Sequence, residues 1–185
     1  MPEKADKIDL NAALTAYENG DDGAFDVIFE EMRGPLCFFI NRYVNDPDVA
    51  EDLVMDTFAA LLLNIKRFNR NSRLSTYLFT IARNKSIDYI RRNKNKLLKL
   101  DENTPDEDYQ RIEEEYIRNE EYQRLHFEMR ELSENYRTVL HLYYFEEMSV
   151  EDIAIVMRKN KKQIYNLLHR AREELKTRLG GNYEK

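Results

Sequence analysis

Three carboxylates, Glu51, Asp52 and Asp56, come closest by type and spacing to a chemical site. Asp52 and Asp56 are four residues apart, so on a helix they share a face and could hold a metal ion or act as an acid–base pair. Neither a Glu-x-x-His pattern nor a second set of acids completes such a site, and the three histidines are scattered. We therefore predict no metal, no cofactor and no catalytic centre, and we interpret these acids as a protein-binding or solvated face.

A different chemistry is indicated by residues 66–99, where cations and aromatic rings are interleaved. This segment carries 11 basic residues against one acid, Asp88, which is a net charge of +10. Because rings stack on exposed bases and cations neutralise the backbone, the composition favours single-stranded nucleic acid. The alternatives are a helix core for Tyr77 and an ordinary basic tail for Arg91 and Arg92.

A third candidate site is a run of long donors and amides in residues 161–172. Such side chains near the start of a helix read base edges in the major groove, while other cations hold phosphates. The alternative is a solvated basic helix. The candidate residues are Lys161, Lys162, Tyr165, Asn166, His169, Arg170 and Arg172.

The elements that must position these residues are predicted to be helices. Only 5 Gly and 4 Pro occur in 185 residues, fewer than an all-β chain with frequent turns would need. Hydrophobic residues make up 42% and charged residues 35%, which suits small helical cores with a large wet surface. No apolar run is long enough for a membrane span, and Cys37 alone cannot form an internal disulfide. The fold class is therefore all-α.

Helix signals divide the first half of the chain. Apolar spacing predicts a helix over residues 10–17, and another that begins near Asp22 and is interrupted at Gly34-Pro35. Asp46 followed by a proline is typical of a helix start. Ser72 is predicted to cap a further helix that carries the basic and aromatic residues.

Over residues 93–121, Lys-rich sequence gives way to an acidic stretch with few apolar residues, and this segment is interpreted as a mobile linker. A helix is then expected from Ser133 to about Phe145. The Ser149–Asp152 and Asn160–Gln163 segments fit capping patterns, and a three-residue turn separates the two short helices that they begin. This arrangement predicts a helix-turn-helix whose second helix is basic.

Charge is distributed unevenly along a chain whose net charge is −6. Residues 1–65 carry 14 acids and 4 bases (net −10), residues 101–121 carry 10 acids and 2 bases (net −8), and residues 158–178 carry 8 bases and 2 acids (net +6). Acidic segments thus flank both basic ones, which indicates two separate anionic contacts.

These segments resemble, in order, the conserved regions of the extracytoplasmic-function (ECF) group of bacterial RNA polymerase sigma factors. The similarity covers nearly the whole chain. It is carried by residues 48–58, 75–84 and 88–92, which resemble region 2, and by residues 132–140, 144–145, 149–154 and 168–172, which resemble region 4.

The resemblance implies two small helical domains joined by an acidic flexible linker: region 2 over residues 1–97, the linker over 98–121, and region 4 over 122–185. It implies an alternative sigma factor rather than an enzyme, acting in the cytoplasm, with core RNA polymerase, promoter DNA and an anti-sigma factor as partners and without membrane insertion. Core polymerase would bind Glu51, Asp52, Met55 and Asp56. The −10 element would be read and held open by Phe68, Arg70, Arg73, Asn84, Lys85, Tyr89, Arg91 and Arg92, and the −35 element by the residues of the 161–172 helix given above.

The chain departs from the family pattern at several positions, so its promoter cannot be copied from relatives. Met55 stands where a polar residue is common, Arg158 replaces the usual turn glycine, Lys159 replaces an apolar residue, and Tyr165 and Leu167 stand where Lys and Arg are common. Three alternatives stay open: a free-standing helix-turn-helix factor, which would be a dimer, an all-helical enzyme, and an adaptor that binds only proteins.

Overall fold

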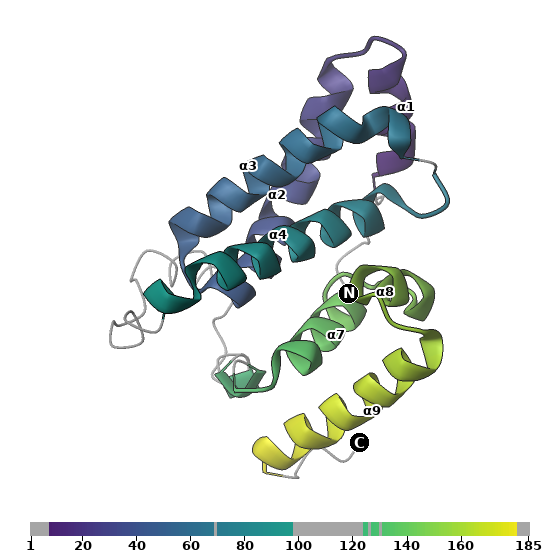
Figure 1. The fold of residues 1–185 in the computed structure, drawn as a ribbon. Coiled ribbons are helices and arrows are strands. Elements are labelled where there is room, and N and C mark those ends of the chain that lie inside the picture. The colour runs from purple at the N-terminus through teal and green to yellow at the C-terminus, as the bar shows by residue number, and fades with distance from the viewer. Residues whose placement is uncertain (1–7, 69, 98–123, 126, 130, 181–185) are drawn as a thin grey trace. The chain divides into compact units, whose positions relative to one another are not determined.

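Helices account for all the regular structure in the part of the computed structural model that is described, namely residues 8–68, 70–97, 124–125, 127–129 and 131–180 (Figure 1). The elements are α1 (Leu10–Glu18), α2 (Gly23–Val44), α3 (Pro47–Asn64), the 3₁₀ turn η1 (Ile65–Arg67), α4 (Leu74–Leu97), α7 (Glu134–Tyr144), α8 (Val150–Met157) and α9 (Lys161–Arg178).

The chain divides into two compact units, Met1–Ser86 and Ile87–Lys185, and the point of division along the sequence falls inside α4. This architecture confirms the all-α prediction of two helical domains. The predicted acidic linker lies outside the described residues, and the bounds of the three segments proposed from the sequence stay predictions.

In the first unit, α1 and α3 both pack on α2, and the core is largely aromatic. The ring of Phe39 meets that of Phe79 edge to face at 5.1 Å, which joins α2 to α4. Phe58 of α3 contacts both Phe25 and Phe29, with ring centroids 6.0 and 4.9 Å apart. Such edge-on and tilted ring pairs stabilise a core beyond the area that they bury.

The predicted interruption at Gly34-Pro35 is wrong, because α2 runs through both residues without a break. A proline inside a helix removes one backbone hydrogen bond and is normally unfavourable. On both sides of it, however, Met32, Leu36 and Ile40 continue one buried face. Burial of that continuous face outweighs the local cost of the proline.

The cap predicted at Ser72 is also wrong. Because α4 begins at Leu74, Ser72 lies one position too early to be its capping residue. The first N–H group of α4 instead donates to a side chain from α1: Leu74 N lies 2.9 Å from Asn11 Oδ1. By contrast, the cap predicted at Asp46 is confirmed, since its carboxylate accepts from Val49 N at 3.1 Å.

The second unit is built on α7, α8 and α9, which all contact one another. Ser149 accepts from Asp152 N at 3.1 Å at the start of α8, and Asn160 and Gln163 form a reciprocal capping box at the start of α9. Both capping predictions are confirmed. A three-residue turn joins α8 to α9, which confirms the predicted helix-turn-helix. Its buried core includes Val139, Leu140, Leu142, Ile153, Val156, Ile164, Leu168 and Ala171.

Candidate nucleic-acid interface

The helix α9 presents its polar residues to solvent and its apolar residues to α7 and α8. Ile164, Leu168 and Ala171 are buried. All seven residues that the sequence proposed for this helix are exposed: Lys161, Lys162, Tyr165, Asn166, His169, Arg170 and Arg172. Most of them recur at the four-residue spacing that places side chains on one side of a helix. The arrangement therefore offers a stripe of donors on the second helix of a helix-turn-helix, as major-groove binding requires.

Two residues of this stripe already contact neighbouring helices. Lys161 Nζ lies 2.6 Å from Glu151 Oε1 of α8, and this hydrogen bond raises the pKa of Lys161 and lowers the pKa of Glu151. Arg172 Nε donates to Tyr144 Oη at 2.7 Å, and its guanidinium lies over the rings of Tyr143 and Tyr144. Arg172 therefore also joins α9 to α7.

The turn before α9 depends on an unusual backbone conformation. Arg158, at the end of α8, has φ 52° and ψ 47°, the left-handed region. That region disfavours residues with a Cβ and favours glycine. The glycine that the family commonly has at this position is thus explained by the geometry, and this chain forms the same turn with an arginine.

The segment between η1 and α4 was expected to supply aromatic and cationic contacts. Phe68 is buried, with its ring stacked on that of Tyr77 at 4.9 Å. In this conformation the ring is packed in the unit rather than presented to a nucleic-acid base. Arg70 and Arg73 are exposed at the surface of the same segment.

Along α4 the predicted residues form a polar surface that begins within the helix and continues toward its end. Asn84, Lys85 and Tyr89 are half-buried, whereas Arg91 and Arg92 are exposed. Lys85 Nζ lies 3.4 Å from Asp56 Oδ2 of α3. Arg91 pairs with Asp88 at 3.1 Å on the same helix.

The residues predicted to bind a protein lie on α3. Asp52, Met55 and Asp56 are exposed, with 55% of the Met55 surface accessible. Glu51 differs from them because it is half-buried and held by Arg33 of α2, whose Nη2 lies 3.0 Å from Glu51 Oε1. The structure thus brings three of the four residues together on one exposed face.

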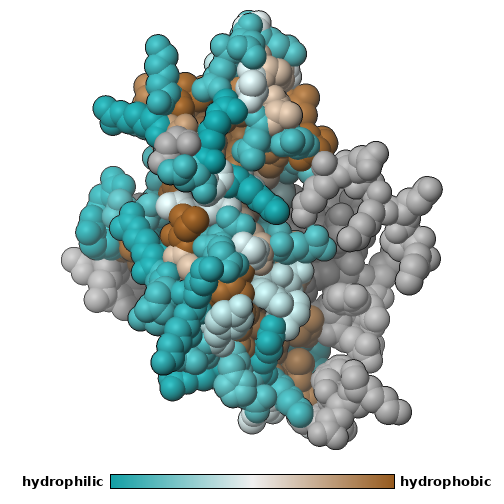
Figure 2. Space-filling model, turned by 90° about the vertical axis from the view of Figure 1, so that its right-hand side faces the viewer, coloured by the Kyte–Doolittle hydropathy of each residue, from teal (hydrophilic) through white to brown (hydrophobic). Residues whose placement is uncertain are grey.

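The exposed face of α3 is longer than the sequence analysis proposed. Leu62 and Leu63 are exposed, Leu63 to 85%. They lie seven or eight residues beyond Met55, so they continue the same face by helical periodicity. Helical periodicity counted from Asp52 could have predicted from the sequence that Leu62 and Leu63 are exposed on this face. Hydrophobic areas among the hydrophilic majority are visible on the surface in Figure 2.

Among the residues that the structure describes, no group of acidic, histidine or cysteine side chains could hold a metal ion. Within the same residues, every helix is too short or too polar to cross a membrane. The prospective binding surfaces are therefore the polar stripe of α9, the polar side of α4 with the segment before it, and the exposed face of α3.

Comparison with known proteins adds family information to this geometry. Residues 28–96 match the family model described as sigma-70 region 2, and residues 122–175 match sigma-70 region 4. The chain is 28% identical to the ECF RNA polymerase sigma factor SigM of Bacillus subtilis, over 82% of this chain and 92% of the relative. It is 27% identical to SigW, an ECF RNA polymerase sigma factor of the same organism, over 92% of this chain and 96% of that relative.

Two solved structures share the fold. The sigma factor RpoE, in complex with the anti-sigma factor NepR from Bartonella quintana, aligns with a TM-score of 0.67 and 24% identity, covering 85% of this chain and 98% of that one. CnrH, in complex with the cytosolic domain of CnrY, aligns with a TM-score of 0.66 and 22% identity, covering 94% and 98%.

Proposed function

This chain belongs to the extracytoplasmic-function group of bacterial RNA polymerase sigma factors, and from that premise we propose how its surfaces divide the work of transcription initiation. It is an alternative sigma factor: it binds core RNA polymerase, recognises the −10 and −35 promoter elements and promotes DNA melting. Its own contribution is binding energy and positioning, and the chemistry of RNA synthesis belongs to the polymerase.

The observation that carries the residue assignment is the exposure of all seven predicted residues on α9. We assign this helix to the major groove of the −35 element. Lys162, Asn166 and Arg170 lie four residues apart and are the best placed to reach base edges or phosphates. Tyr165, 60% exposed, adds an aromatic ring to the same surface.

The −10 element is assigned to the polar side of α4 and to the segment from Phe68 to Arg73. Asn84, Lys85, Tyr89, Arg91 and Arg92 supply hydrogen-bond donors, charge and one aromatic ring along that helix. Because Phe68 is stacked on Tyr77, its part in binding a base requires that ring pair to open. Stacking on aromatic rings, together with phosphate neutralisation, is how single strands are commonly held.

Core polymerase is assigned to the exposed face of α3, with Asp52, Met55 and Asp56 at its centre. The two leucines that follow, Leu62 and Leu63, extend it with apolar surface. Exposed hydrophobic residues rimmed by charge are typical of protein-binding surfaces.

An anti-sigma factor is the proposed regulatory partner. The solved structures that share the fold include a sigma factor bound to the anti-sigma factor NepR. Since RNA polymerase acts on the chromosome, the proposed compartment of this chain is the cytoplasm.

The test is transcription with purified core polymerase, this chain and a genomic fragment library, followed by sequencing of the RNA ends. We expect discrete starts that depend on the chain and share sequence near −10 and −35. With an active core and a working control sigma factor, an absence of such starts together with no core binding in a pull-down contradicts the assignment and favours a free-standing DNA-binding protein.

A further inference from the structure

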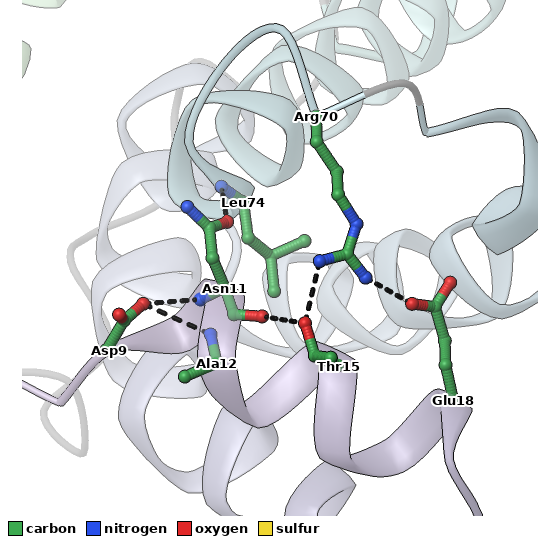
Figure 3. A network of polar contacts seen from close by, with 7 residues as sticks. All are labelled: Asp9, Asn11, Ala12, Thr15, Glu18, Arg70 and Leu74. Carbon is green, nitrogen blue, oxygen red and sulfur yellow. Dashed lines mark hydrogen bonds and ion pairs between the residues drawn. The ribbon is translucent and has the colours of Figure 1, made fainter.

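The helix α1 has no part in the function as assigned so far, and it precedes residue 28, where the region 2 match begins. Its polar residues Asn11, Thr15 and Glu18 are spaced four and three apart, which places them on one face. All three contact the segment that leads into α4, more than fifty residues further along the chain (Figure 3).

The contacts of α1 reach both ends of this segment. At its start, Arg70 Nη1 donates to Thr15 Oγ1 at 2.6 Å, and Arg70 Nη2 forms an ion pair with Glu18 Oε2. At its end, Leu74 N donates to Asn11 Oδ1 at 2.9 Å. Side chains on two turns of α1 therefore hold both Arg70, at the start of the segment, and Leu74, the first residue of α4.

The receiving face of α1 is itself held in place. Thr15 Oγ1 donates to Asn11 O at 2.9 Å, which orients the hydroxyl lone pairs toward Arg70 (Figure 3). Asp9 caps the helix by accepting from Asn11 N at 3.0 Å and Ala12 N at 3.1 Å. The acceptors that face Arg70 thus belong to a capped and hydrogen-bonded helix.

The backbone at Arg70 gives a second, independent observation. Its φ is 57°, in the left-handed region that residues with a Cβ rarely adopt. Such conformations persist where surrounding contacts fix them, and they cluster at functional segments. Here the side chain of the same residue supplies those contacts through Thr15 and Glu18.

From these contacts we infer that α1 sets the conformation of the −10-reading segment, residues 70–73, and that Arg70 is a positioning residue rather than a phosphate contact. The inference rests on the proposed function, which assigns this segment to the −10 element. The guanidinium donates to α1 through both of its terminal nitrogens, which directs the side chain to that helix. Promoter preference at −10 then depends on residues of α1 that need not touch DNA.

The first experiment exchanges the two charges. Holoenzymes with Arg70→Glu, Glu18→Arg or both changes are tested on a library of −10 sequences, with the −35 element fixed. We expect each single variant to weaken transcription from the preferred −10 element by about three- to tenfold, the range of one exposed ion pair plus one hydrogen bond. The double variant re-forms the ion pair with its charges exchanged but lacks the donor to Thr15, so we expect it to recover part of the level and of the preference.

The controls separate the possible failures. Glu31→Arg makes the same charge change at an exposed position of α2 and is expected to leave the −10 preference unchanged. If the double variant melts at the wild-type temperature yet recovers none of the loss, Arg70 contacts DNA directly and the inference fails while the proposed function stands. A wild-type chain that directs no starts with core polymerase overturns both.

A second pair of variants avoids charge and folding defects. Thr15→Val keeps the size of the side chain but removes the acceptor for Arg70, whereas Thr15→Ser keeps the hydroxyl. We expect Thr15→Val to change the −10 preference and Thr15→Ser to leave it unchanged. Neither variant is expected to change the −35 preference. Equal −10 preferences for Thr15→Val, Thr15→Ser and wild type contradict the inference.

Discussion

Lys161 and Arg172 stand near the two ends of the polar stripe of α9, and each is held by a different neighbour. The pair between Lys161 and Glu151 is exposed on both sides, and exposed pairs contribute little and exchange easily. A DNA phosphate can therefore replace Glu151. Arg172 is hydrogen-bonded to Tyr144 and lies over two rings, so a substitution there affects packing as well as charge.

The Lys161–Glu151 pair makes a pH-dependent contribution to stability whose sign follows from the two pKa shifts. The pKa of Glu151 is lowered, so its contribution is present above its unfolded-state pKa and is lost as pH falls through the lowered value. The pKa of Lys161 is raised, so its contribution is lost as pH rises through the raised value. We expect Glu151→Gln to lower the melting temperature slightly at neutral pH, with the difference vanishing in acid and at high pH.

Melting of the wild type and Glu151→Gln over a pH series measures this. Glu173→Gln, which removes an exposed charge on α9, is the matched control. A difference between Glu151→Gln and wild type that persists unchanged in acid below the lowered pKa of Glu151 contradicts the assignment, because the carboxyl is then protonated in both states.

Asn166 is exposed on α9 and carries both a donor and an acceptor, as base-edge recognition requires. We expect Asn166→Ala to relax the −35 preference at one base pair by about 1–3 kcal/mol, without changing the −10 preference. Competition binding of the holoenzyme to −35 variants measures this. Thr177→Ala, near the end of the same helix, is the control, and an equal loss on every −35 sequence would assign Asn166 to a phosphate instead.

At the scale of the elements, the sequence correctly predicted helix starts that depend on contacts within one helical turn. Asp46, Ser149 and Asn160 each cap a helix whose N–H group lies three residues away, so type and spacing sufficed. The start of α4 could not be predicted in this way. Its first N–H group is bound by Asn11, 63 positions earlier, and a polar contact at that separation leaves no periodic pattern.

Other features that the sequence did not predict have the same origin. The helix α2 continues through Pro35 because tertiary burial overrides a local helix-breaking signal. The ring of Phe68 was proposed as a base contact from its type and position, whereas its stacking on Tyr77 depends on how η1 and α4 approach each other. The exposed polar residues of α9 were predictable because an amphipathic helix fixes its own outer side.

The turn between α8 and α9 leads to a prediction about stability. Since Arg158 has φ 52°, we expect Arg158→Gly to stabilise the second unit by about 0.5–1 kcal/mol, as relief of the left-handed conformation outweighs the added freedom of the unfolded chain. Amide exchange in α8, measured over a urea series, gives the free energy of unfolding of this unit for the variant and the wild type.

The matched control is Arg170→Gly, the same substitution within α9, where the backbone is right-handed. It should destabilise the unit by about 1 kcal/mol. Equal effects of the two glycines would mean that the left-handed backbone at Arg158 carries no cost.

At the scale of the whole molecule, several cations assigned to DNA are paired with carboxylates of the chain itself. Lys85 pairs with Asp56, Arg91 with Asp88 and Lys161 with Glu151. DNA affinity depends chiefly on cations that neutralise phosphates, so these internal pairs compete with promoter DNA. The pair between Lys85 and Asp56 also links a residue assigned to DNA with one assigned to core polymerase.

We therefore expect the free chain to bind promoter duplex poorly at physiological salt, and its holoenzyme to bind it at least about a hundredfold more tightly. Fluorescence anisotropy with a labelled promoter, across a salt series and with core polymerase alone as the control, measures both affinities. Nanomolar, sequence-specific binding by the isolated chain contradicts this expectation.

The contacts between α1 and residues 70–74 also bear on how promoter specificity can be moved between proteins. A chimaera that grafts residues 68–73 of this chain onto a relative transfers the peptide but not Asn11, Thr15 and Glu18, which hold its two ends. The grafted peptide is then free to follow the host's own first helix. Specificity at −10 can be transferred only when α1 and residues 68–73 are transferred together. Sigma factors with a separate −10 preference are therefore better built by exchanging these two segments as one unit.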